Sequence, residues 1–209
     1  MGIGKIQFRF IEKCMNECEI PPHTMLELGN QKLKDGLDKR LGFKTSKDYY
    51  KSVGFKHVSF DLNGEDNAIP VDLSKMITNI KYYGYFDVVT NSGTSEHVEP
   101  LKKQYECFKN IHLCMKVGGI AIHIIPEYKT YPKHSNIYYR RIFWDMLAKS
   151  NGYKILFLET LTKKNGATLL SCCYRKEMDS QFAQERESLL KNIYYKKGNR
   201  KPHYGKARL

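Results

Sequence analysis

The stretch FDVVTNSGTSEHV, residues 86–98, decides the fold of this chain. It begins with a short strand-forming run, Phe86 to Thr90, in which Asp87 is the only acid. A run this short and apolar is typical of a central strand in a sheet that is covered on both faces. The residues that follow, 91–95, are loop and cap formers. Because ligands of open α/β sheets bind at the carboxyl ends of the strands, this segment predicts the position of a site.

Strand and helix patterns alternate on both sides of this stretch. The predicted strands span residues 24–28, 56–62, 68–73, 86–91, 120–125, 155–162 and 167–174, and the predicted helices span residues 5–18, 46–53, 74–81, 99–116, 139–149 and 177–195. Residues 30–45 are expected to form a long loop. Asn165-Gly166 lies between the last two strands and is the strongest short-range signal for a β-hairpin. The order predicts an α/β fold, an open, doubly wound, seven-stranded and mostly parallel sheet that ends in an antiparallel C-terminal hairpin.

Length and composition predict one ordinary domain. The 209 residues are divided into a domain at residues 1–190, which includes the helix at 5–18, and a basic tail at residues 191–209. No apolar run approaches the roughly 18 residues that span a bilayer, so no membrane association is predicted. The first residues lack the apolar core of a secretory signal, and a cytoplasmic location is expected.

The cysteines predict neither a disulfide framework nor a metal site. The six of them include no C-x-x-C pair. We therefore expect reduced and mostly buried thiols, and no metal-binding residues are predicted.

The net charge of +13 is concentrated near the end of the chain. Seven lysines and arginines and no acids lie between Lys191 and Leu209, interleaved with Tyr194, Tyr195 and Tyr204. Such a segment is either a grip for a nucleic-acid backbone with stacking aromatics or a solvated basic tail.

The order of these signals resembles a class I, Rossmann-like S-adenosylmethionine-dependent methyltransferase, over residues 24–175. MLELG at 25–29 is similar to the family's first motif, a strand with an acid before a glycine loop. Asp61 matches the acid that binds the ribose hydroxyls, and residues 86–89 with 96–98 are similar to the fourth-strand pattern. Residues 116–119, KVGG, resemble the segment that precedes the fifth strand, and the terminal hairpin fits strands six and seven.

The resemblance implies S-adenosylmethionine as the cofactor and a site at the strand ends. The predicted cofactor-binding residues are Glu27, Gly29, Asn30, Gln31, Asp61, Leu62, Asp72, Leu73, Asn91 and Ser92. Glu27 is expected either to order the glycine loop or to meet the cationic end of the cofactor. The family's loop continues as G-x-G, whereas Asn30-Gln31 follows Gly29 here, so Gln31 either binds the cofactor carboxylate or obstructs the pocket.

Two histidines are the predicted catalytic residues, because an imidazole near a cleft titrates close to neutrality and can act as a general base. His97 follows the fourth strand, and His134 lies on the loop after the fifth. A capping or surface role is the alternative for His97, and His123, in the middle of a strand, is expected in the core.

Three functions are compatible with these patterns. The first is methyl transfer to a small-molecule acceptor at O, N or C. The second is an RNA or DNA methyltransferase that uses residues 191–209, although residues 91–94, NSGT, differ from the (N/D)PP(Y/F) motif of amino-methylating enzymes. The third is a catalytically silent binding protein that keeps the cofactor fold. The acceptor and the oligomeric state are not predicted.

Overall fold

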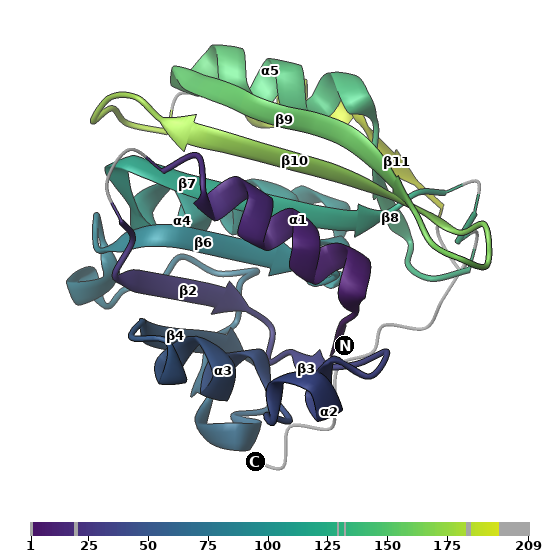
Figure 1. Ribbon diagram of the computed structural model, residues 1–209. Coiled ribbons are helices and arrows are strands. Elements are labelled where there is room, and N and C mark those ends of the chain that lie inside the picture. The colour runs from purple at the N-terminus through teal and green to yellow at the C-terminus, as the bar shows by residue number, and fades with distance from the viewer. Residues whose placement is uncertain (1, 19–20, 129, 132, 183–184, 197–209) are drawn as a thin grey trace.

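The computed structural model describes residues 2–18, 21–128, 130–131, 133–182 and 185–196. Its centre is a seven-stranded sheet in the order β5-β4-β2-β6-β7-β10-β9 (Figure 1). These strands are β5 (Ile69–Pro70), β4 (Lys56–Asp61), β2 (Thr24–Leu28), β6 (Phe86–Ser92), β7 (Met115–Pro126), β10 (Thr168–Lys176) and β9 (Tyr153–Thr162). Neighbouring strands from β5 to β7 are parallel, and β10 is antiparallel to both β7 and β9. The predicted fold class is thereby confirmed.

Helices cover both faces of this sheet because its strands alternate between two apolar clusters. One cluster contains residues of α1 (Lys5–Met15) and α3 (Ser46–Ser52), packed on Met25 and Val88. The other contains residues of α4 (Gln104–Cys114) and α5 (Arg141–Asn151), packed on Leu26 and Val89. Adjacent residues of β2 and β6 thus point to opposite layers, as the pleat of a strand requires.

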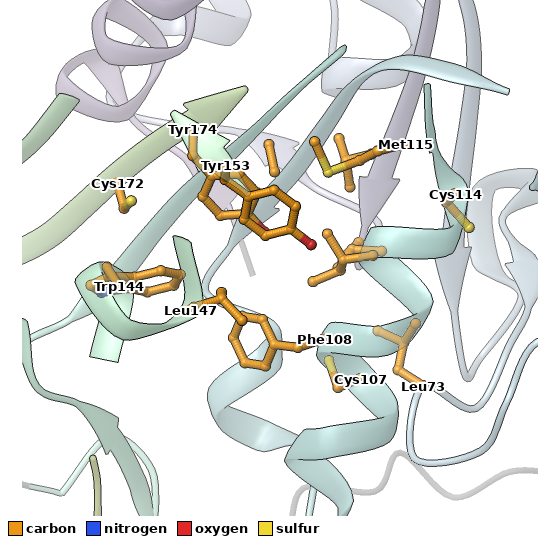
Figure 2. Packing of buried hydrophobic residues seen from close by; sticks show 14 of the residues in the cluster. Leu73, Cys107, Phe108, Cys114, Met115, Trp144, Leu147, Tyr153, Cys172 and Tyr174 are labelled. Carbon is orange, nitrogen blue, oxygen red and sulfur yellow. The ribbon is translucent and has the colours of Figure 1, made fainter. Parts of the chain in front are cut away.

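The second cluster is rich in aromatic and sulfur-containing side chains. Figure 2 shows Phe108 of α4 beside Trp144 of α5, with Tyr153 and Tyr174 from the terminal hairpin. The Tyr153 and Tyr174 rings stack with centroids 4.5 Å apart. All six cysteines are free thiols, and only Cys18 is not buried, as expected from the sequence.

The predicted helix at 177–195 is wrong. Within the described residues of this segment only α6 (Arg186–Lys191) is helical, and β11 (Ile193–Tyr195) pairs antiparallel with β8 (Ile137–Tyr139). Both strands have the sequence IYY, and their aromatic and β-branched residues favour a strand once a partner is present. The folded part therefore extends beyond residue 191, and residues 197–209 of the predicted basic tail lie outside the described residues.

The predicted helix at 74–81 is also wrong. Asn110 of α4 binds the backbone here: its Oδ1 accepts from the N–H of Ile77 at 3.0 Å and its Nδ2 donates to the carbonyl of Lys75 at 2.8 Å. These bonds replace helical ones, so residues 76–79 are not helical, and the short 3₁₀ helix η2 (Ile80–Tyr82) follows them. A side chain distant in sequence thus decides the conformation of this segment.

The helix predicted at 99–116 ends earlier than expected, because β7 already begins at Met115. A Cβ on Gly119 would lie 3.0 Å from the carbonyl oxygens of Phe86, Asp87 and Lys116. The glycine thus allows β7 to approach β6 closely, next to a shift in the strand register. The KVGG segment belongs to a strand and does not end a helix.

The segment predicted as a long loop at 30–45 contains regular structure. β3 (Lys32–Leu33) pairs in parallel with β1 (Gly2–Ile3), and α2 (Leu37–Leu41) follows. Three further 3₁₀ helices are η1 (Glu65–Asn67), η3 (Ser95–His97) and η4 (Leu101–Lys103). Among the described residues, no helix is long and apolar enough to cross a membrane.

Asp87 lies near the amino end of β6, on the side of the sheet opposite the carboxyl ends where a ligand would bind, and it links the amino ends of neighbouring strands. Its Oδ2 accepts from the N–H of Thr24 at 2.8 Å, and its Oδ1 accepts from Lys116 Nζ at 2.8 Å. Burial alone would raise the pKa of Asp87, but the hydrogen bonds from Lys116, Thr24 and the His23 backbone outweigh it and lower that pKa to about 2. Asp87 therefore stabilises the fold.

Candidate cofactor site

A cleft lies at the carboxyl ends of β2, β4 and β6, where the sequence predicts a site. It has a volume of about 590 Å³ including its open mouth. Its lining residues are Gly29, Phe60, Asp61, Leu62, Val71, Asp72, Leu73, Ser74, Thr94, His97, Val98 and Glu99. Five predicted cofactor-binding residues (Gly29, Asp61, Leu62, Asp72 and Leu73) therefore line one cleft, together with His97.

Asp61 is the last residue of β4 and connects the cleft to the glycine loop. Its Oδ2 accepts from the N–H of Asn30 at 2.8 Å, and its Oδ1 accepts from the N–H of Asn63 at 3.3 Å. The carboxylate is half-buried and remains in the lining of the cleft. It can accept hydrogen bonds from hydroxyl groups of a ligand while its position is fixed by the backbone.

Glu27 lies beneath the glycine loop and does not line the cleft. It is 1% exposed, and its carboxylate accepts from the N–H of Gln31 at 3.1 Å and from the hydroxyl of Ser46. Burial is the main cause that raises the pKa of Glu27 to about 7, against the hydrogen bonds from Ser46 and Gln31. Of the two roles considered for Glu27, this placement favours ordering of the loop.

Asn30 and Gln31 are buried in the loop that follows Gly29, whose φ of 77° is left-handed. Asn30 Nδ2 donates to Asp66 Oδ2 at 2.8 Å. Gln31 is 0% exposed, and its amide lies 3.4 Å from the Thr94 hydroxyl and 3.4 Å from the Leu28 carbonyl. The Gln31 side chain therefore bridges the loops after β2 and β6, behind Thr94 in the cleft wall.

Asn91 faces the core and shapes the turn that carries Glu96 and His97. It is fully buried, and its Oδ1 accepts from the N–H of Ser95 at 3.0 Å. Its amide donates to His123 Nδ1 at 2.9 Å, because burial lowers the pKa of His123 to about 3 and keeps that ring neutral. His123 is thus a core residue, as expected.

Gln104 and Tyr139 complete the support of this turn. Gln104 Nε2 donates to the carbonyls of Ser95 at 2.8 Å and Val98 at 2.7 Å. The Tyr139 hydroxyl donates to Gln104 Oε1 at 2.6 Å and lies 2.8 Å from the Ser95 hydroxyl. Side chains from α4 and β8 therefore fix the backbone on both sides of Glu96.

The two predicted catalytic histidines lie next to each other, with ring centroids 5.0 Å apart. Glu96 stands between them. Its Oε1 is 3.7 Å from His97 Nε2 and 3.3 Å from His134 Nε2, and its side chain is 0% exposed. Sequence reasoning used Glu96 only as part of a motif, because an acid in a polar loop is usually solvated.

A second cavity adjoins this group and is lined by Ser92, Gly93, Pro126, Tyr131 and His134, among others. Its volume is about 700 Å³ including its open mouth. Gly2, Gly4 and Gln7 of the N-terminal segment and Lys163 of the hairpin also line it. Ser92 and His134 thus belong to this cavity, whereas His97 belongs to the cleft.

Thr94, Val98 and Glu99 are further cleft residues that the sequence analysis did not single out. All three follow β6 within or directly after the opening motif. Their position in the loop directly after β6, which crosses the strand ends, is the feature that could have identified them as cleft residues.

Comparison with known proteins relates this chain to solved structures only. No protein-family model and no curated protein sequence matches it. The N-methyltransferase NodS from Bradyrhizobium japonicum, in complex with S-adenosyl-L-homocysteine, is similar with a TM-score of 0.59 and 9% identity over 84% of this chain and 89% of that chain. A SAM-dependent methyltransferase from Methanosarcina mazei gives 0.54 and 10% identity over 78% and 97%.

A third similar structure is 1,6-didemethyltoxoflavin-N1-methyltransferase from Burkholderia thailandensis, with a TM-score of 0.53 and 14% identity over 75% of this chain and 72% of that chain. Identities this low concern the fold. Together with the strand order, they show that the chain has the fold of the class I, Rossmann-like S-adenosylmethionine-dependent methyltransferases.

Proposed function

We propose that the protein transfers a methyl group from S-adenosylmethionine to a small-molecule acceptor. The observation that carries this proposal is the convergence of Gly29, Asp61, Leu62, Asp72 and Leu73 on one cleft at the carboxyl ends of parallel strands. When bound, the cofactor supplies the activated methyl group.

The residues of the cleft fit the adenosine half of this cofactor. Asp61 presents a carboxylate that would accept hydrogen bonds from the ribose hydroxyls, held in place by Asn30 and Asn63. Leu62, at 44% exposed, and Leu73, at 7%, offer apolar surface for a planar base. Gly29 lets the backbone come close to the ligand, since a side chain would be strained at its φ of 77°.

The second cavity is the proposed acceptor site. It lies over the ends of β6 and β7, and the Glu96, His97 and His134 group separates it from the cleft. Holding the acceptor beside the cofactor is the main catalytic task of the chain, because orientation supplies much of the rate of a transfer reaction.

A basic groove next to this cavity favours an acceptor with an anionic group. Lys5, Arg9, Lys163 and Lys164 line the groove, which shares Asp35 and Lys163 with the second cavity. This groove also supports nucleic acid as a second candidate acceptor, independently of residues 197–209.

Truncation of the chain after Lys196 keeps β11 and tests the role of residues 197–209 alone. We expect a small-molecule enzyme to keep its activity after this truncation, whereas loss of RNA or DNA binding would favour the second candidate.

Calorimetric titration of the full chain with S-adenosylmethionine and S-adenosylhomocysteine tests the proposed function. Saturable binding in the micromolar range, about −8 kcal/mol, is expected for a cofactor site. Absence of binding up to millimolar concentration would favour the silent binding protein instead.

A further inference from the structure

We propose that Glu96, His97 and His134 bind a divalent transition-metal ion between the cofactor cleft and the second cavity. Each residue offers one ligand atom, and these atoms all lie within 4.8 Å of one another. They are the only such group of three among the described residues. The cysteine spacing predicted no metal site, and the positions of the two histidines predicted general bases instead.

The distances between the ligand atoms are close to those of a metal site. With bonds of about 2.1 Å and angles between about 90° and 110°, ligand atoms around zinc lie about 3.0–3.4 Å apart. Glu96 Oε1 is 3.3 Å from His134 Nε2 and 3.7 Å from His97 Nε2. The third distance, between the ligand nitrogens of the two histidines, is at most 4.8 Å, so small side-chain shifts would bring all three ligand atoms onto one ion.

Glu96 is the most unusual member of the group. Its side chain is 0% exposed, and neither carboxylate oxygen accepts a hydrogen bond from any residue in the part of the chain that the structure describes. A buried carboxylate is usually neutralised or well hydrogen-bonded, because its desolvation is otherwise very unfavourable. The two imidazoles reach the same oxygen, Oε1. A cation shared by all three side chains accounts for this arrangement.

Hydrogen bonds from neighbouring side chains fix the backbone at the three ligand residues. Glu96 and His97 belong to η3, which Asn91 and Gln104 fix through Ser95. The loop of His134 is closed by the Tyr138 hydroxyl, which accepts from the N–H of His134 at 3.1 Å. Asn136 Nδ2 donates to Glu99 Oε1 at 2.9 Å and joins the two loops. Such a frame preorganises a ligand set.

The donor set selects the class of ion. Two imidazoles and one carboxylate suit Zn²⁺, Co²⁺, Ni²⁺ or Fe²⁺, whereas Mg²⁺ and Ca²⁺ prefer oxygen ligands. Three protein ligands leave coordination positions for an oxygen of the acceptor, such as a hydroxyl or a carboxylate. His97 lines the cleft and His134 lines the second cavity, so the ion would lie between the two spaces. This role towards the acceptor rests on the proposed function, but the binding of the ion does not.

Titration of the full chain with Co²⁺, after treatment with a chelator and removal of any tag, tests the site. Visible d–d absorption reports coordination, and competition with Zn²⁺ gives the affinity. We expect saturation at one ion per chain. Glu96→Gln, His97→Gln and His134→Gln should each weaken binding by about 100-fold or more, since even the loss of an outer hydrogen-bond partner weakens metal binding by about 10- to 100-fold.

His23→Gln is the matched control, because His23 is exposed and only its backbone contacts Asp87. Circular dichroism of each variant verifies folding, and nitrogen chemical shifts of the imidazoles upon Zn²⁺ addition identify the ligands in the unaltered chain. The proposal is overturned if Co²⁺ does not bind, if the three variants bind it as well as His23→Gln does, or if a thiolate charge-transfer band shows cysteine ligands.

Cofactor binding distinguishes this failure from failure of the proposed function. S-adenosylmethionine binding without Co²⁺ binding would refute the metal site alone. Co²⁺ binding at these residues without binding of S-adenosylmethionine would keep the metal site and refute the methyltransferase.

Discussion

His134 Nε2 lies 3.3 Å from Glu96 Oε1, although the two residues come from different loops. Glu96 follows β6 and His134 follows β7, and these strands are parallel neighbours. The carboxyl ends of neighbouring parallel strands lie on the same side of the sheet, so the loops that follow these strands are adjacent. The same geometry places His97, in the wall of the cleft, next to His134, in the wall of the second cavity.

Asp61→Ala is expected to weaken the binding of S-adenosylmethionine by about 100-fold. The change removes a charged acceptor for the ribose hydroxyls, and a hydrogen bond to a charged group contributes about 1.5–3 kcal/mol. Calorimetry measures the affinity, and Asp179→Ala, which alters an aspartate that is 90% exposed, is the control. Unchanged affinity of Asp61→Ala would show that the ribose is bound elsewhere.

Glu27→Gln is expected to stabilise the protein above neutral pH. The pKa of Glu27 is raised to about 7 in the folded chain, above its usual value of about 4.3. The folded state therefore binds this proton more tightly than the unfolded state. Stability from Glu27 is fully present below about pH 4 and is lost as pH rises through about 7.

Urea unfolding at pH 5 and pH 8 checks this prediction. At pH 8 the variant should gain on the order of 2 kcal/mol relative to the parent, and the difference should shrink at pH 5. Glu177→Gln, at an exposed position, should change neither value. A variant destabilised equally at both pH values would mean that the hydrogen bonds from Gln31 and Ser46 outweigh the buried charge.

Asp87→Asn is expected to destabilise the protein by on the order of 2 kcal/mol at neutral pH, because charge-assisted hydrogen bonds from Thr24 and Lys116 are lost. The pKa of Asp87 is lowered to about 2. Its contribution is thus present above the unfolded value of about 3.9 and is lost as pH falls through about 2. In urea unfolding, the variant should approach the parent near pH 2, and Asp145→Asn, at an exposed position of α5, should match the parent throughout. A constant difference between Asp87→Asn and the parent down to pH 2 would contradict the assigned cause.

The elements that the sequence predicted well are those whose own residues carry the signal. The apolar runs at 24–28, 86–91 and 120–125 all lie within strands of the central sheet, and Asn165-Gly166 turns the chain between β9 and β10. By contrast, the strand pairing of residues 193–195 and the conformation of residues 74–81 depend on partners distant in sequence, Tyr139 and Asn110.

The sequence by itself determined the order along the chain of the seven strands of the central sheet, the glycine turn after β2 and the acid at the end of β4, because short-range periodicity and turn chemistry encode them. Only the tertiary structure decided which polar residues face the cleft. It placed Asn91 and Gln31 inside the protein and brought Glu96 to His134, because burial and the meeting of loops depend on how the strands are arranged in the sheet.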